Sequence, residues 1–81
     1  MSKKDKQFQR LLHQKTLSSD EAIRLLEIDG WYEDPNNPQK RSHKQFVHPF
    51  KKGKVTVPAN RKALVKDTKD DILIQAGLMG D

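Results

Sequence analysis

The fold of this chain is decided by residues 31–58, which read WYEDPNNPQKRSHKQFVHPFKKGKVTVP. Aromatic and β-branched residues gather in three short runs, at 31–34, 41–48 and 54–57, and such residues favour strands. Proline, asparagine and glycine separate the runs, and these residues interrupt strands and form turns. Connections this short are typical of antiparallel neighbours. We therefore predict a three-stranded antiparallel meander.

Two helical patterns precede this stretch. Residues 3–15 carry one thin apolar stripe at helical spacing. A second helix begins at Ser18, which can form a capping box with Glu21 three residues later. Gly30 suits the left-handed residue that ends this helix. The chain thus enters the sheet from a pair of helices.

A last helix follows the strands. Thr68 with Asp71 three residues on has the spacing of a cap, and Gly77 suits the end of that helix. We expect Leu64 and Val65 to pack beneath it. The predicted order is α-α-β-β-β-α, and helices that flank one antiparallel sheet usually cover the same face. We therefore predict an α+β fold whose other sheet face is open to solvent or to a partner.

Length and composition exclude several classes of protein. Eighty-one residues make one domain with a small core. The chain has no cysteine, which excludes disulfides and thiolate catalysis and fits a reducing cytosol, so we expect a cytoplasmic protein. No apolar run approaches about 20 residues, so we expect no membrane span. No hydrophobic segment follows the first four residues, so we expect no secretory signal.

Positive charge is sorted along the chain rather than spread over it. The segment 35–66 contains nine Lys and Arg residues and no Asp or Glu, so its formal charge is +9. The rest of the chain has a formal charge of −4. A local positive field of this kind attracts polyanions such as RNA. A solvated basic surface without function is the alternative that this pattern leaves open.

Two histidines, His43 and His48, lie inside the basic segment. Five residues apart on one strand, they would point to opposite faces, which argues against a metal site built on the pair. Ser42 would likewise point away from His43 on a strand, so nothing supports a Ser-His-Asp triad. His43 is left as one imidazole among Lys and Arg residues.

One imidazole beside cations is close to the minimum that RNA cleavage requires. RNA carries its own nucleophile, the 2′-hydroxyl, which must lose a proton while charge on the phosphoryl oxygens is stabilised. Histidine is the side chain best suited to move protons near neutral pH. Neither a metal nor another cofactor is needed. Residue types alone leave two readings of His43 open: a catalytic group, or a surface histidine on a basic strand.

Four segments in order resemble the HicA family, small mRNA interferases of bacterial toxin–antitoxin systems. They are Asp29-Gly30-Trp31-Tyr32, then Ser42-His43-Lys44-Gln45-Phe46-Val47-His48-Pro49, then Lys51-Lys52-Gly53-Lys54-Val55-Thr56-Val57-Pro58, and Ile74-Gln75-Ala76-Gly77-Leu78. No single segment is specific, but their order and spacing match from about residue 18 to residue 78. The resemblance covers most of the chain.

The resemblance implies a fold like that of double-stranded-RNA-binding domains for residues 17–81, with residues 1–16 as an N-terminal helical extension. It implies a toxin that cleaves mRNA independently of the ribosome, as a metal-independent endoribonuclease with His43 as the catalytic residue. It implies a HicB-like antitoxin that covers the His43 face. We expect RNA to contact residues beside the histidine and lysines of the hairpin that follows it: Arg41, Ser42, Lys44, Lys51, Lys52 and Lys54.

The chain departs from the family pattern in the residue before Ser42, in the residues after Pro58, and in the loop from Asp34 to Gln39, which is longer than usual. Arg41 stands where the family usually has glycine before the Ser-His pair, and no histidine follows Pro58. Arg41 either hinders the approach of RNA or adds a phosphate contact. Two other readings therefore stay open beside the nuclease. One is a non-catalytic RNA-binding module of the same fold, and the other is a basic protein-interaction domain.

Overall fold

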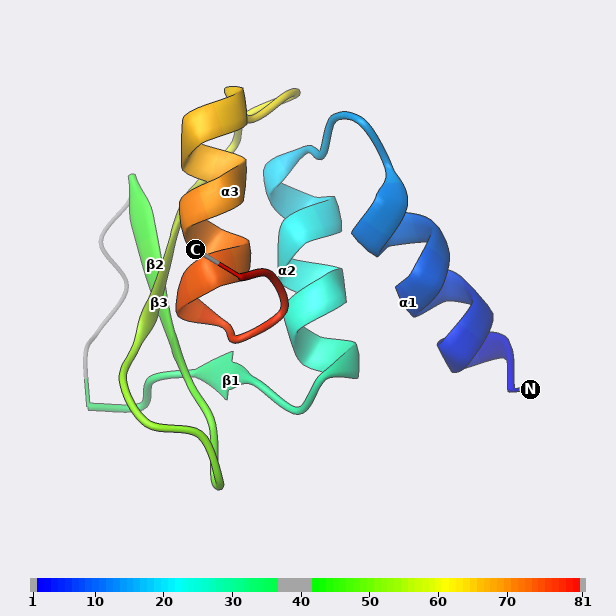
Figure 1. The fold of residues 1–81 in the computed structure, drawn as a ribbon. Helices are drawn as coiled ribbons and strands as arrows, with labels where there is room; N and C mark the ends of the chain where they lie inside the picture. The colour runs from blue at the N-terminus through cyan, green and yellow to red at the C-terminus, as the bar shows by residue number, and fades with distance from the viewer. Residues whose placement is uncertain (1, 37–41, 81) are drawn as a thin grey trace.

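The structure, a computed structural model, describes residues 2–36 and 42–80 of the chain. Its elements follow the predicted order α-α-β-β-β-α (Figure 1). They are α1 (Lys3–His13), α2 (Ser19–Ile28), β1 (Tyr32–Glu33), β2 (His43–Val47), β3 (Val55–Pro58) and α3 (Lys66–Gln75). Within these two ranges, no helix has the length and apolar character that a membrane crossing requires.

The three strands form the predicted antiparallel meander, in the order β1-β2-β3. Tyr32 of β1 pairs with Val47 of β2, and His43 at the start of β2 pairs with Pro58 at the end of β3. Proline is tolerated there because β3 is an edge strand and the ring has no N–H to offer a further strand. The α+β fold class predicted from the sequence is confirmed.

One face of the sheet packs against the helices. Phe46, Val55 and Val57 are buried, while α2 and α3 both contact β3 on this side (Figure 1). Burial of these side chains removes apolar surface from water, which is the main stabilising term for a domain of this size. The remaining core residues come from the helices and loops: Leu11, Leu17, Ala22, Leu25, Leu26, Trp31, Leu64, Ile72, Leu73 and Ala76.

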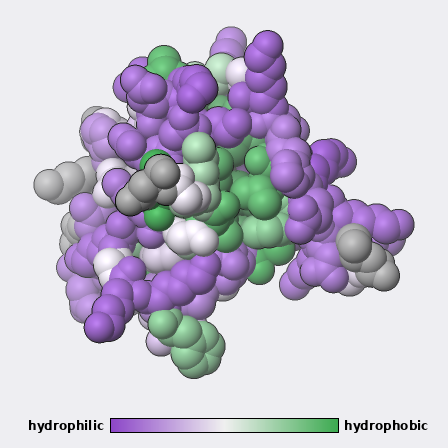
Figure 2. Space-filling model, viewed as in Figure 1, coloured by the Kyte–Doolittle hydropathy of each residue, from purple (hydrophilic) through white to green (hydrophobic). Residues whose placement is uncertain are grey.

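α1 packs on α2 rather than on the sheet (Figure 1). Its Leu11 is buried in the common core, and Phe8 and Leu12 are partly buried against that core. Hydrophobic surface remains visible between α1 and the rest of the molecule, on a face that is otherwise mostly hydrophilic (Figure 2). The leading helix is therefore a packing element of the same core.

The start of α2 is fixed by the capping box that the sequence predicts. The Ser18 hydroxyl accepts a hydrogen bond from Glu21 N at 3.1 Å, and the Glu21 carboxylate accepts one from Ser18 N at 2.9 Å. Gln14 Nε2 also donates to this carboxylate, at 2.9 Å. The hydrogen bonds from Gln14 and from the Ser18 backbone lower the pKa of Glu21 below its ordinary value.

Ser19, the first residue of α2, ties this helix to the chain beyond β3. Its side chain is buried, and its hydroxyl donates to Pro58 O at 2.5 Å and accepts from Arg61 N at 2.9 Å. Ser19 N also donates to Arg61 O at 2.9 Å. Three hydrogen bonds thus hold the end of β3 and the loop after it against the helix.

α3 begins three residues earlier than the cap predicted at Thr68 implies. Its N-cap is Val65, which makes no side-chain capping bond and is 68% exposed, so Val65 does not pack beneath the helix as expected. The buried Leu64 explains both differences. Its N–H donates to Leu17 O at 2.7 Å, which anchors the chain just before the helix turns away. Thr68 therefore lies inside the first turn rather than at the cap.

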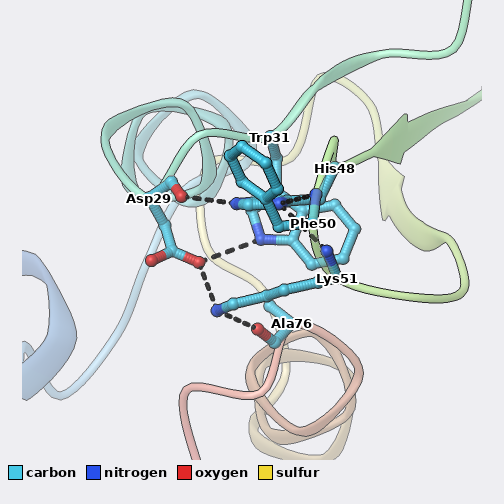
Figure 3. Close-up of polar contacts among 6 residues, drawn as sticks. All are labelled: Asp29, Trp31, His48, Phe50, Lys51 and Ala76. Carbon is cyan, nitrogen blue, oxygen red and sulfur yellow. Dashed lines mark hydrogen bonds and ion pairs between the residues drawn. The ribbon is translucent and has the colours of Figure 1, made fainter.

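His48 anchors the connection between β2 and β3 (Figure 3). Its Nδ1 accepts hydrogen bonds from Phe50 N at 3.0 Å and Lys51 N at 3.2 Å, and its Nε2 lies 2.8 Å from Asp29 O. Because both partners of Nδ1 are donors, the ring proton is on Nε2 and is donated to the carbonyl. A Cβ on Gly30 would come within 2.8 Å of Nε2, so glycine is required for this approach.

Lys51 joins the same connection to the ends of two helices. Its Nζ lies 2.6 Å from Asp29 Oδ2, just after α2, and donates to Ala76 O at 3.0 Å, just after α3 (Figure 3). Trp31 Nε1 donates to the same Asp29 carboxylate oxygen at 3.1 Å. The hairpin is thus held in place by polar contacts of the turn that joins its two strands.

We expect Ser19→Ala to destabilise the domain by about 1–3 kcal/mol, because Arg61 N and Pro58 O lose their buried partner. Urea unfolding followed by circular dichroism measures this. Ser2→Ala is the control, because Ser2 caps the exposed start of α1. A loss for Ser19→Ala no larger than that for Ser2→Ala would show that the buried hydroxyl does not hold the loop.

We expect Glu21→Gln to lower the free energy of unfolding at neutral pH but not in acid. A carboxylate whose pKa is lowered on folding stabilises the protein above its ordinary pKa of 4.5, and this contribution is lost as pH falls through the lower, folded value. Urea unfolding of both proteins across this range measures the difference. Parallel stability curves with no convergence in acid would contradict this account of Glu21.

Candidate active site

His43 stands at the corner of the sheet where β2 begins and β3 ends. Its side chain is exposed, and Nδ1 lies 3.0 Å from the Ser42 hydroxyl oxygen. Nε2 has no hydrogen-bond partner among residues 2–36 and 42–80. One ring nitrogen is therefore oriented by a neighbour while the other is free to exchange a proton with a ligand.

The contact between Ser42 and His43 corrects the expectation that these side chains point apart. That expectation required both residues to lie on a strand, but β2 begins at His43. Because Ser42 lies outside the strand, its side chain does not have to point to the opposite face from His43. Its hydroxyl can hold the imidazole in one orientation, as the third group of a catalytic triad does.

A pocket of about 300 Å³ opens beside His43. It lies where β2 begins, β3 ends and α3 begins, and these three places meet at one end of the molecule (Figure 1). Its walls are mostly apolar, with three side chains that can bind polar groups. The lining residues are His43, Pro58, Arg61, Ala63, Leu64, Val65 and Thr68.

The loop after β3 brings Arg61 to this pocket. Ala59 N donates to Ser42 O at 2.9 Å, which joins the loop to the residue before His43. Asn60 adopts a left-handed backbone conformation, with φ of 61°, and asparagine tolerates this better than most residues. Two hydrogen bonds then fix the Arg61 backbone: its N–H donates to the Ser19 hydroxyl, and its carbonyl accepts from Ser19 N. Sequence reasoning counted Arg61 among the basic residues but did not place it at the site.

Lys44 does not share this corner with His43. Strand side chains alternate, and Lys44 pairs with the buried Val57, so it belongs to the face that packs against the helices. Its side chain is half-buried there. Any contact between Lys44 and RNA would therefore come from a different side of the strand than the histidine.

The hairpin lysines lie at the other end of β2. The last residue of β2, Val47, lies four residues beyond His43, which is about 13 Å at the rise of an extended chain. Lys51 pairs with Asp29 and Lys54 with Asp34, at 2.6 and 2.9 Å, whereas Lys52 is exposed. The structure therefore separates the expected RNA-binding residues into a corner and a hairpin.

The ion pair of Lys54 also sets the charge of its partner. Asp34 is buried, and the hydrogen bond from Lys54 together with one from Asn36 N lowers the pKa of its carboxyl below the ordinary value. A carboxylate with its negative charge beside Lys54 offsets the positive field on that side of the hairpin.

Arg41, the remaining residue that we expected to contact RNA, lies outside the described residues.

The face of the sheet that the helices leave uncovered carries an aromatic residue. Tyr32 is 50% exposed and pairs with Val47, which alternation places on the same face as His43. A macromolecule that reaches the histidine across this face would therefore contact Tyr32 as well.

Within the described part of the chain, no group of three His, Cys, Asp or Glu side chains is placed to hold a metal ion.

Comparison with known proteins identifies the family. The family model for the HicA toxin of bacterial toxin–antitoxin matches residues 19–78, which run from the first residue of α2 to just beyond α3 and include the whole pocket. None of the curated proteins matches the chain. The match covers well over half of the sequence and starts after α1. The chain therefore belongs to the HicA family, the toxins of bacterial toxin–antitoxin systems.

Proposed function

We propose that this toxin is an endoribonuclease that cleaves mRNA without a metal ion and uses His43 as its single catalytic histidine. The observation that carries the proposal is the state of the His43 ring. One nitrogen contacts the Ser42 hydroxyl, and the other, unpaired among the described residues, belongs to a ring that lines an open pocket. An imidazole in this setting can accept a proton from a bound substrate.

The reaction that fits this geometry is an internal attack by the substrate. His43 Nε2 takes the proton of a ribose 2′-hydroxyl, and the oxygen forms a bond to the adjacent phosphorus. The bond from phosphorus to the 5′-oxygen of the next nucleotide breaks, that oxygen receives a proton from water, and His43 returns its proton to the solvent. The products are a 2′,3′-cyclic phosphate and a 5′-hydroxyl end. Ser42 acts as a positioning residue for the ring.

Charge in the segment 35–66 would supply most of the affinity for RNA, because contacts to phosphates do not depend on sequence. Of the three hairpin lysines proposed to bind RNA, Lys51 and Lys54 already pair with acids, whereas Lys52 has no ion pair within residues 2–36 and 42–80, so its charge is available to phosphate. Phe50 beside it is 90% exposed and offers a surface on which a base can stack.

A HicB-like antitoxin is the proposed protein partner, and it would cover the face that carries His43. An occluding partner would meet Tyr32 and the histidine on the open sheet face, with basic residues at both ends of β2. Acidic and aromatic side chains would complement this surface. Covering the pocket excludes RNA without any change in the toxin fold.

His43→Ala is expected to abolish RNA cleavage, with a loss of at least about 10²-fold, because it removes the proposed acceptor of the 2′-hydroxyl proton. His13→Ala is the matched control, since His13 is exposed at the end of α1. Gel electrophoresis of RNA incubated with each protein in EDTA measures the loss. Cleavage by a folded His43→Ala protein would refute the assignment, and wild type that only shifts RNA mobility would favour the non-catalytic binding module.

We expect Lys52 to contribute to RNA binding and Lys51 to contribute to the stability of the fold. We expect Lys52→Met to reduce the slope of log K against log salt by about 1 with little change in stability. Lys51→Met should lower the free energy of unfolding, because it leaves the partly buried Asp29 carboxylate without its cation. RNA titrations at several salt concentrations and urea unfolding measure the two effects. Identical behaviour of the two variants would contradict the division.

A further inference from the structure

We infer that Arg61 binds the scissile phosphate beside His43, and that the pocket these two residues share is the site of a 3′-phosphate group. The inference rests on the proposed nuclease function and adds the second group that the reaction requires. Nothing in the sequence motif marks Arg61, which follows the last strand by three residues. The case rests on its anchoring, its free charge and the chemistry of the pocket.

The anchoring of Arg61 joins it to the catalytic corner. Its backbone N–H and carbonyl both form hydrogen bonds with Ser19, at 2.9 Å each, and these bonds restrain the position of the loop at this residue. Two residues earlier, Ala59 N binds Ser42 O, next to the histidine. These contacts fix the backbone of Arg61, so its exposed side chain extends toward the pocket from a defined position, and a donor positioned in advance favours electrostatic catalysis.

The charge of Arg61 is not neutralised within the described residues. Lys51, Lys54 and Lys66 each pair with a carboxylate, at distances from 2.6 to 2.9 Å. Arg61 makes no such pair in the same part of the chain, although it also borders a hollow on the other side of its loop that Asp20 lines. The guanidinium is therefore available to an anion.

The pocket suits a phosphodiester in the transition state of cleavage. When the 2′-oxygen attacks, negative charge develops on the non-bridging phosphoryl oxygens, and His43 cannot both accept the proton and neutralise this charge. A guanidinium can bind two phosphate oxygens at once. Leu64 and Val65 line the pocket beside these groups, and their apolar surface lowers the local dielectric in which the guanidinium meets the phosphate. The Thr68 hydroxyl on the α3 side is a further donor to the same group.

Single-turnover kinetics of three variants tests the inference. We expect Arg61→Ala to lower the maximal rate by about 10²-fold with a smaller change in the RNA concentration at half-saturation. Arg61→Lys should recover only part of the rate, because an ammonium cannot bind two oxygens in the same plane. Lys62→Ala is the matched control: it removes the adjacent exposed cation and should weaken RNA binding without lowering the maximal rate.

A second measurement does not depend on activity. We expect uridine 3′-monophosphate to shift the amide NMR signals of residues 42–43 and 61–68 in wild type and in Lys62→Ala. Arg61→Ala should weaken this binding by about tenfold or more, since a charged hydrogen-bonded partner is lost. Thermal unfolding confirms that the variant is folded, because the bonds to Ser19 use only the Arg61 backbone.

The two measurements separate the possible failures. Wild-type cleavage with an Arg61→Ala rate within about threefold of wild type, or an equal loss in Lys62→Ala, would overturn the role of Arg61. Nucleotide binding that requires Arg61 in a protein that does not cleave RNA would support the phosphate pocket and refute the nuclease. A wild-type protein that neither cleaves RNA nor binds the nucleotide would refute both proposals.

Discussion

The arrangement of this domain depends on the buried side chain of Ser19, which is 1% exposed. Its hydroxyl accepts a hydrogen bond from Arg61 N and donates one to the carbonyl of Pro58. This single side chain therefore links α2 to the end of β3 and to the loop that follows. A buried hydroxyl without partners would be costly, but both of its hydrogen-bonding roles are filled. The position of the pocket beside His43 follows from this junction.

His48, in the turn after β2, and His43, at the start of β2, have different surroundings and therefore different roles. His48 has partners on both ring nitrogens and contacts the edge of Trp31, with ring centroids 5.2 Å apart, so it holds the hairpin. Among the residues that the structure describes, His43 has a partner on one nitrogen only. The lysines divide in the same way, since Lys51 holds two helix ends while Lys52 is exposed. Charge counted along a sequence therefore overstates the charge available to a ligand.

Local signals in the sequence predicted most of the fold, because the period of apolar residues, the capping box at Ser18 and the glycine stops each act over a few residues. The start of α3 was missed because the buried Leu64, a tertiary contact, overrides the side-chain cap expected at Thr68. His43 could be singled out from its chemistry and its family resemblance. Arg61 could not, because its place depends on the register of β2 with β3 and on hydrogen bonds to Ser19.

The central claim is that the exposed imidazole of His43 activates the hydroxyl of the substrate itself. The most direct test compares an RNA that the protein cleaves with the same oligonucleotide carrying a single 2′-deoxyribose at the cleavage position, both in EDTA, with products analysed by mass spectrometry. The account predicts a 2′,3′-cyclic phosphate from the RNA and no cleavage at the substituted position. Cleavage at that position, or 5′-phosphate ends on the products, would contradict it.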